Sequence, residues 1–171
     1  MLSDIMISSF GFWGKETMDN HIAFFAPADD SRVKDKILSR NAATAKHGIV
    51  LTESQAAAIA ASQTAALKKT GRIEFGFGIA YKAISLFADS PYIIPDEYEQ
   101  TISDLISLFY TFRNEADGIL SDDELLNFMK NSFDGRCAGS LELLAQQMSE
   151  FSRHLRSGGA PETFEKEGRN L

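Results

Sequence analysis

The sequence contains a single cysteine, Cys137, and no run of apolar residues long enough to form a membrane-spanning helix. One cysteine excludes an intrachain disulfide, which fits a reducing compartment. A membrane span needs about 20 consecutive, mostly apolar residues, and no segment approaches that length. The first residues make a poor signal peptide, because Asp4 stands where a basic residue is wanted and Ser8 and Ser9 interrupt the apolar run. These features predict a soluble, cytoplasmic protein.

Basic residues are also scarce, since 17 Lys and Arg oppose 24 Asp and Glu and leave a net charge of −7 at pH 7. Binding to nucleic acids or to anionic membranes relies on basic surface, so we expect neither kind of partner. The length of 171 residues and the apolar fraction of 44% are those of an ordinary globular domain that buries a real core.

Helical patterns dominate the middle of the chain. Two pairs of residues, Thr52 with Gln55 and Ser121 with Glu124, have the spacing of capping boxes at the start of helices. Apolar residues recur at alternating spacings of three and four, as on one face of a helix. We expect short loops between helices over residues 31–47, 52–70, 79–88, 95–112, 121–133 and 140–157. The fold class predicted is all-α, a single-domain bundle of about six helices.

The two ends of the chain differ in composition from this helical domain, which we place at residues 31–157. Residues 1–30 form an aromatic N-terminal arm that contains Phe10, Trp13 and Phe24. This arm is too apolar to be left fully in water, so we expect it to pack on the domain or on a partner. Residues 158–171 begin with two glycines and continue as a polar segment, which predicts a flexible C-terminal tail.

The loop at residues 114–124 resembles a calcium-binding loop at first sight, because acids, a glycine and a final glutamate follow one another at similar spacing. Aligning Gly118 with the loop glycine of an EF-hand, however, puts Arg113 at the first ligand position. A guanidinium stays protonated and repels a cation. The same residues are explained by a turn at Gly118 and a capping box at Ser121, so we predict no metal site.

Acidic residues dominate the stretch between residues 89 and 124, where Arg113 is the single basic residue. One interpretation is a solvated face combined with the acids that favour helix starts. The other is a docking surface that attracts a basic partner. We favour the first. The acids concerned are Asp89, Asp96, Glu97, Glu99, Asp104, Glu115, Asp117, Asp122, Asp123 and Glu124.

Three loops, at residues 72–78, 89–92 and 134–140, hold most of the polar residues outside the helical patterns. If these loops converge at one end of the bundle, five residues become candidates for binding a small ligand: Arg72, Glu74, Asp89, Arg136 and Cys137. The alternative is that the loops are plain connections and that Cys137 is a buried apolar residue. The three histidines lack metal-ligand spacing, and no set of residues matches a known catalytic motif.

Several of these segments together have a familiar order. They are the residues at 40–44, 48, 51–56, 71–76, 89–93, 109–115, 121–125, 133–137 and 139–142, including GRIEFG, DSPYI, FYTFRNE and FDGRC. In this order they resemble an uncharacterised bacterial family, domain of unknown function 6323. The resemblance covers about residues 40–155 and implies no activity, cofactor or catalytic residue.

Two hypotheses follow for the function. The first is a non-catalytic interaction or regulatory module, without a cofactor, that binds a protein partner or associates with itself. The second is an enzyme or small-ligand binder that uses a pocket formed by loops 72–78, 89–92 and 134–140.

Overall fold

The structure is a computed structural model that describes residues 29–116 and 119–167, with the side chains from residue 165 onward left out. Within the described residues it is all-α, as predicted, and contains no strand. The elements are α2 (Asp30–Leu38), α3 (Asn41–Thr44), the 3₁₀ helix η1 (Ala45–His47), α4 (Glu53–Thr70), α5 (Ala80–Phe87), the 3₁₀ helix η2 (Pro95–Glu97), α6 (Tyr98–Arg113), α7 (Asp122–Asp134), α8 (Leu141–Arg156) and α9 (Pro161–Glu167).

The predicted capping boxes are both present and set the starts of α4 and α7. The Thr52 hydroxyl accepts a hydrogen bond from the Gln55 amide, and the Gln55 side chain accepts one from the Thr52 amide. Ser121 and Glu124 make the same reciprocal pair. These local contacts satisfy amides that have no partner inside the helix, which explains why sequence spacing located both helix starts.

The single helix predicted over residues 31–47 is wrong, because the chain turns between α2 and α3. The Asn41 side chain brackets the backbone of Leu51, accepting from its amide at 2.9 Å and donating to its carbonyl at 2.8 Å. The Ser39 hydroxyl donates to the Lys36 carbonyl at 2.6 Å as α2 ends. A tertiary contact ten residues along the chain therefore overrides local helix propensity.

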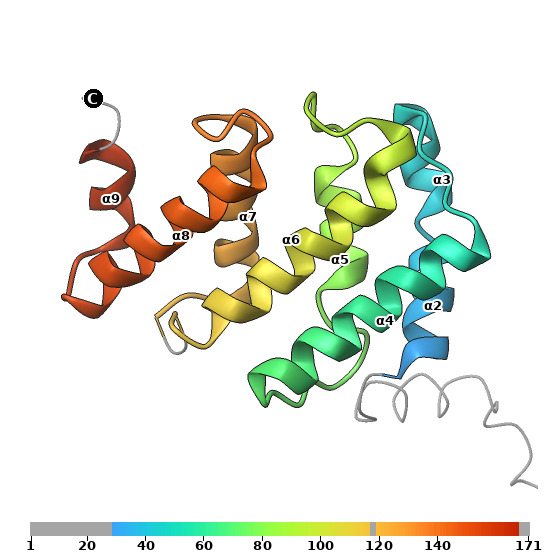
Figure 1. The fold of residues 1–171 in the computed structure, drawn as a ribbon, viewed down its shortest axis with the longest axis horizontal. Coiled ribbons are helices and arrows are strands. Elements are labelled where there is room, and N and C mark those ends of the chain that lie inside the picture. The colour runs from blue at the N-terminus through green and yellow to red at the C-terminus, as the bar shows by residue number, and fades with distance from the viewer. Residues whose placement is uncertain (1–28, 117–118, 168–171) are drawn as a thin grey trace, which may run out of the picture.

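The bundle is built around α4 and α6, which lie side by side (Figure 1). Helix α2 packs on α4, while α5, α7 and α8 pack on α6. Ala56 and Ala60 of α4 are fully buried, and their small side chains allow neighbouring helices to approach closely. Phe109 and Tyr110 of α6 are likewise fully buried, so α6 forms the centre of the core.

A buried glutamine fixes the connection between α4 and α5. The Gln63 side chain, fully buried, accepts a hydrogen bond from the Ala80 amide at 2.8 Å and donates one to the Phe77 carbonyl at 3.1 Å. Gly78 has a φ of 63° and lies against this side chain, in space that any other residue would need. Buried polar groups must be paired, so Gln63 specifies the path of residues 77–80.

The segment after residue 157 contains a helix that the sequence analysis did not anticipate. Helix α9 packs on α8 and α7 through Phe164. The flexibility of residues 158–171 stays a prediction. Nearly all of the predicted N-terminal arm lies outside the described residues. Its last residues are the exception, because Asp29 caps α2 by accepting from the amides of Ser31 and Arg32. Among the described residues, no helix combines the length and apolarity needed to cross a membrane.

Candidate functional site

The three loops that hold the predicted site residues lie at two different ends of the bundle. The α5–α6 and α7–α8 connections are at the same end, whereas the α4–α5 connection is at the opposite one (Figure 1). Arg72 and Glu74 line one cavity, Arg136 lines another, and Asp89 and Cys137 line neither of these two. The structure thus does not gather the five residues in one pocket, and their ligand-binding role stays a prediction.

Arg72 and Glu74 line a polar cavity of about 410 Å³ beside the α4–α5 connection. Lys82 of α5, Arg113 at the end of α6 and Asp122 at the start of α7 complete its wall. Arg113 forms an ion pair with Asp122, and Arg72 Nη1 donates to Asn114 Oδ1 at 2.8 Å. The charges in this cavity therefore largely satisfy one another and hold the loop to α6.

Glu74 is the chemically distinctive group in this cavity. Its Oε2 accepts a hydrogen bond of 2.6 Å from the buried hydroxyl of Tyr110, which in turn accepts from the Ile79 amide at 3.3 Å. Burial raises the pKa of the Glu74 carboxyl above its ordinary value, although the Tyr110 hydrogen bond opposes this effect. Burial and the neighbouring Glu74 also raise the pKa of the Tyr110 hydroxyl. A perturbed carboxyl in a cavity is a candidate for proton transfer or ligand binding.

Asp89 belongs to a polar clamp between the end of α5 and the end of α7. Lys130 Nζ lies 2.9 Å from Asp89 Oδ1 and also contacts Asp134, whose Oδ1 accepts from the Ser90 hydroxyl at 2.6 Å. The Lys130 hydrogen bond lowers the pKa of Asp89. Loops 89–92 and 134–140 therefore contact each other, and this contact fastens the end of α5 to the end of α7.

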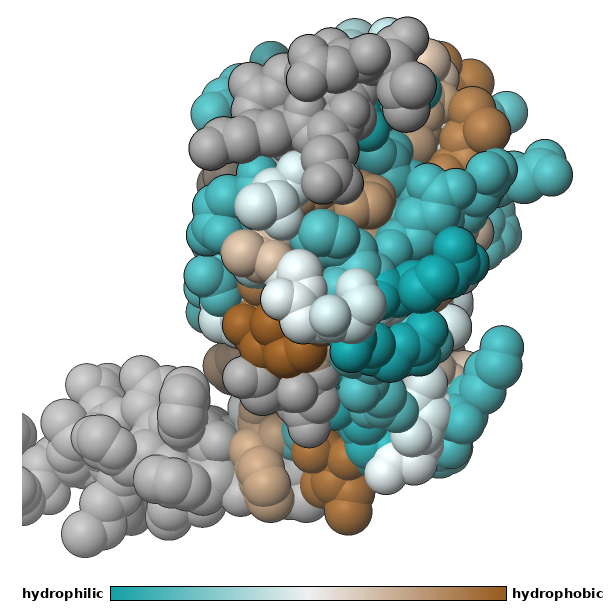
Figure 2. Space-filling view, turned by 90° about the vertical axis from the view of Figure 1, so that its left-hand side faces the viewer, coloured by the Kyte–Doolittle hydropathy of each residue, from teal (hydrophilic) through white to brown (hydrophobic). Residues whose placement is uncertain are grey.

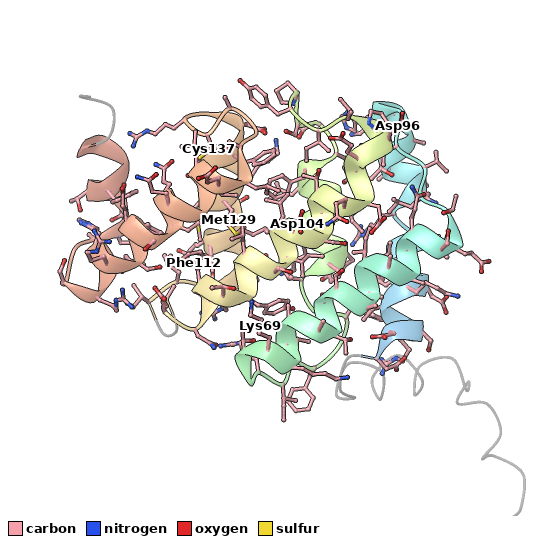
Figure 3. The ribbon with its side chains drawn as sticks, in the orientation of Figure 1. Lys69, Asp96, Asp104, Phe112, Met129 and Cys137 are labelled. Carbon is pink, nitrogen blue, oxygen red and sulfur yellow. The ribbon has the colours of Figure 1, made fainter. Side chains whose placement is uncertain are left out.

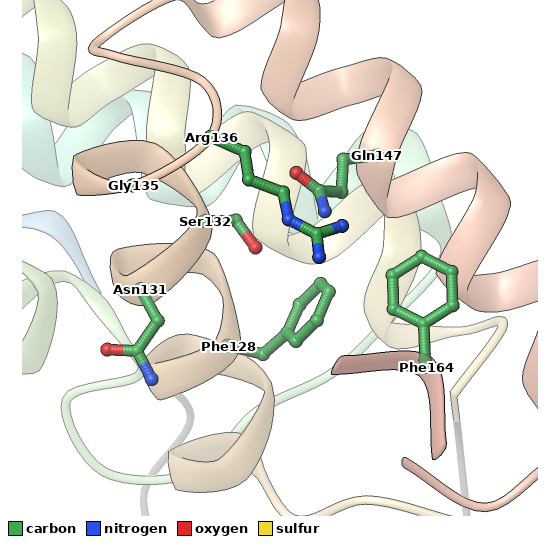
Figure 4. Close-up of a pocket in the computed structure, with 7 residues that line it drawn as sticks. All are labelled: Phe128, Asn131, Ser132, Gly135, Arg136, Gln147 and Phe164. Carbon is green, nitrogen blue, oxygen red and sulfur yellow. The ribbon is translucent and has the colours of Figure 1, made fainter. Parts of the chain in front are cut away.

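Arg136 lines a cavity of about 280 Å³ between α7, α8 and α9. Its guanidinium points into the space between Gln147 and the ring of Phe128, with Phe164 on the far side (Figure 4). The cavity thus combines aromatic walls with one cation, the two carboxamides of Asn131 and Gln147, and the Ser132 hydroxyl. Such a lining suits an apolar group that carries a polar or acidic atom.

Cys137 has the environment of a core residue. The residue is buried near the start of α8 (Figure 3), and its Sγ lies 3.5 Å from Gln147 Oε1. Burial raises the pKa of the thiol, which keeps it protonated and poorly nucleophilic. This environment agrees with the interpretation of Cys137 as a small apolar residue.

The acids of the loop at residues 114–124 have separate partners. Glu115 lies 3.3 Å from Arg156 and Asp123 lies 2.6 Å from Lys82, while Glu124 closes the capping box. Asp117 and Gly118 lie outside the described residues, and among those described no group of three His, Cys, Asp or Glu is placed to hold a metal ion. Glu115, Asp123 and Glu124 therefore serve as local ion-pair and capping partners.

The predicted acidic face is also divided by these pairs. Asp89, Glu115, Asp122 and Asp123 are each neutralised by a nearby cation. Asp96, at the start of the α6 region, and Asp104, further along the helix, lie well apart (Figure 3). A docking role for this face toward a basic partner stays a prediction.

The structure adds one feature that the sequence analysis missed, an aromatic cluster under α9. Phe164 lies with its ring centroid 5.9 Å from Phe128, 5.1 Å from Phe151 and 5.6 Å from the His154 ring. On the side of the molecule where α9 lies, apolar residues form separate patches among polar ones (Figure 2). One signal was available in the sequence, since Phe164 is the single aromatic residue after His154.

Comparison with known proteins adds a family match without a function. A family model described as "Family of unknown function (DUF6323)" matches residues 36–161, which is more than half of the chain. No curated protein and no solved structure matches the chain. The matched residues run from within α2 to the first residue of α9, so Phe164 lies beyond them.

Proposed function

The chain belongs to the family of unknown function DUF6323, as its sequence resemblance predicted, and we propose that it is a non-catalytic interaction protein of the cytoplasm. Its partner is an amphipathic helix with an aromatic anchor. The partner binds in the groove between α7 and α8, which we call the α7–α8 groove and define by Phe128, Asn131, Arg136, Gln147 and Phe151. The observation that carries this proposal is that α9, a short helix with one aromatic anchor, already occupies part of the groove.

Helix α9 shows what the α7–α8 groove accepts. The rings of Phe128 and Phe151 stack at a centroid distance of 3.9 Å, and Phe164 packs on both. A free helix of seven residues is not stable in water, so α9 depends on this contact for its structure. An aromatic anchor inserted between two helices is a recurring way in which proteins bind helical peptides.

The groove is larger than α9. A cavity of about 280 Å³ lies beside Phe164 toward Arg136, and another of about 260 Å³ lies toward Leu120 and Pro161. Phe128 and Asn131 line both. A longer helix that extends in either direction therefore buries more apolar area than α9 does, at roughly 25 cal/mol per Å². That gain supports displacement of α9 by such a partner.

The α9 segment competes with any partner because it is tethered to the groove. A short flexible tether gives an effective concentration in the millimolar range, so a partner must overcome this advantage by burying more surface. Arg136 at the edge of the groove adds a preference for a partner that carries a carboxylate beside its aromatic anchor.

The alternative of a small-ligand binder or enzyme rests on the cavity around Glu74. Its supporting observation is the perturbed Glu74–Tyr110 pair in a polar cavity of about 410 Å³. This alternative has less support, because loop 72–78 lies away from the other two predicted loops and the cations of that cavity already contact acids or amides of the chain.

Site-specific photo-crosslinking in the host cell tests the proposal. A photoreactive residue replaces Asn131, which is exposed and lines both cavities, while Lys69 on α4 serves as the matched exposed control. We expect a crosslinked partner from position 131 and none from position 69, with a higher yield when Phe164→Ala empties the groove. Products of equal yield at both positions, or none at position 131 in either background, would refute the groove as a binding site.

A further inference from the structure

We propose that a further cavity, between α5 and α7, binds a small organic carboxylate through Arg40. The cavity has a volume of about 360 Å³ and is lined by Arg40, Tyr81, Lys82, Leu86 and Leu126, among others. Its lining includes no residue of the Phe128 aromatic cluster and none of the five ligand-binding candidates predicted from the sequence. The inference is therefore independent of the proposed α7–α8 groove.

The guanidinium of Arg40 is held in place but incompletely paired. It lies over the Tyr81 ring with Cζ 5.0 Å from the ring centroid, a contact that fixes the plane of the guanidinium. Its Nε is buried and has no hydrogen-bond partner within the described part of the chain. Buried polar atoms are normally satisfied, so the unpaired Nε indicates that the described part of the chain does not supply all the acceptors that the Arg40 guanidinium needs.

The charges around the cavity favour an anion. Lys36 Nζ lies 5.6 Å from the centroid of the same Tyr81 ring, and neither Lys36 nor Arg40 has an ion-pair partner among the residues described. Lys82, at the rim, is paired with Asp123 at 2.6 Å. Lys36 and Arg40 therefore leave the surroundings of the cavity with a net positive charge, which attracts an anion.

The rest of the lining selects an apolar body for the ligand. Leu86 and Leu126 are half-buried or buried and face the cavity from α5 and α7, and Tyr81 adds an aromatic wall. Small-molecule sites typically combine such apolar walls with a few polar groups in a volume of about 300–1,000 Å³. A monocarboxylate on a short aliphatic or aromatic chain satisfies Arg40 and fills this space at once.

Binding is measured on the full chain by NMR titration with four probes. These are phenylacetate, its neutral analogue 2-phenylethanol, inorganic phosphate, and the blocked peptide acetyl-Leu-Glu-Leu-amide. We expect phenylacetate to shift the amide signals of residues 81–86 and 123–127. The alcohol and phosphate should bind at least about tenfold more weakly, because the alcohol loses the charge-assisted hydrogen bond and phosphate has no apolar body to pack against Leu86 and Leu126.

Two variants and a matched control separate a ligand contact from a structural effect. Arg40→Gln removes the cation. The control, Arg153→Gln, makes the same change at an exposed position of α8, away from the cavity. Ser85→Trp fills the cavity from its exposed rim without altering Arg40. We expect phenylacetate binding to weaken at least about tenfold in Arg40→Gln and Ser85→Trp and to persist in Arg153→Gln.

The proposal fails if phenylacetate gives no shifts near α5 and α7, or if Ser85→Trp, with an unchanged fold, binds it as well as the wild type does. Binding of the peptide without binding of phenylacetate would overturn the assignment of a free acid in favour of a protein partner. Equal binding of 2-phenylethanol would show that Arg40 does not recognise the carboxylate.

Discussion

The ring of Phe128 on α7 stacks on the ring of Phe151 on α8, with the centroids 3.9 Å apart and the planes 18° from parallel. This pair joins the two helices and provides the surface on which Phe164 of α9 rests. Three helices therefore meet at one aromatic cluster, and the last of them is seven residues long.

Phe164→Ala is expected to release α9 while the remaining helices stay folded. The side chain is half-buried, so the loss is about 1–2 kcal/mol, less than for a fully buried phenylalanine. Hydrogen exchange measures the effect, with faster exchange expected in α9 and little change in α4 and α6. The control is Leu143→Ala, at an exposed position of α8. Equal acceleration in all helices would contradict a local latch.

Gly159→Ala is expected to weaken the same latch from the backbone side. A Cβ at this position runs into the His154 ring, whose Nε2 lies 3.0 Å from the Ala160 carbonyl oxygen and 2.9 Å from Thr163 Oγ1. The carbonyl only accepts, so this nitrogen carries the proton that is donated. Moving the ring breaks these contacts and costs roughly 1 kcal/mol.

A double-mutant cycle isolates that effect. In a His154→Ala background the space beside Gly159 is empty, so Gly159→Ala should then cost much less. Chemical denaturation of the four variants gives the coupling energy. A coupling energy of zero would show that the His154 ring is not what excludes a side chain at position 159.

A peptide with the sequence of residues 158–171 is expected to bind in trans to the Phe164→Ala chain, whose groove is emptied. The wild-type chain should bind it more weakly, because its own α9 competes at a millimolar effective concentration. Fluorescence anisotropy of the labelled peptide measures this difference. The matched control is a peptide in which the phenylalanine is alanine. Equal binding of both peptides would mean that Phe164 is not the anchor.

Gln63→Leu is expected to destabilise the chain by about 2–4 kcal/mol, because it leaves the Ala80 amide and the Phe77 carbonyl without partners. The control is Gln146→Leu, at an exposed position of α8, which should change the free energy of unfolding little. Urea denaturation measures both. The first variant should also loosen loop 72–78, since Gln63 holds its last residues in place.

Glu74→Gln is expected to change how stability depends on pH. Burial raises the pKa of Glu74 from an ordinary value of 4.5, so its ionisation is easier in the unfolded chain. Well below pH 4.5 the Glu74 carboxyl is protonated in both states and does not change the free energy of unfolding. As pH rises from 4.5 through the folded pKa, ionisation favours the unfolded chain and lowers the stability of the wild type.

The glutamine at position 74 can still accept the Tyr110 hydrogen bond but cannot ionise. The variant should therefore gain stability relative to the wild type between about pH 4 and pH 7, as followed by urea denaturation at each pH. A gain in stability that grows toward lower pH would contradict a raised pKa of Glu74. Asp104→Gln, on the surface of α6, is the control.

Much of the helical framework was predictable because its signals are local. The capping boxes at Thr52 and Ser121 act over three residues, and the starts of α4 and α7 follow from them. The break between α2 and α3 was not predictable, because it depends on Asn41 holding Leu51. No propensity scale contains that contact.

The candidate site was predicted only in part. Loops 89–92 and 134–140 contact each other through Ser90 and Asp134, whereas the ligand-binding hypothesis requires all three loops to converge. Loop 72–78 lies at the opposite end, since α4 and α5 have lengths and directions that carry it away from them (Figure 1). Phe164 was assigned to a tail because α9 is too short to show a helical period.

The sequence by itself determined an all-helical domain, most helix boundaries, a single thiol and an acidic net charge, since each of these depends on composition or on residues a few positions apart. Only the tertiary structure decided which charges neutralise one another, that Gln63 supports residues 77–80, that Arg40 stacks on Tyr81, and that Phe164 covers Phe128 and Phe151. The physical reason is distance along the chain. Backbone preferences act within one helical turn, whereas these contacts form only after packing brings separate helices together.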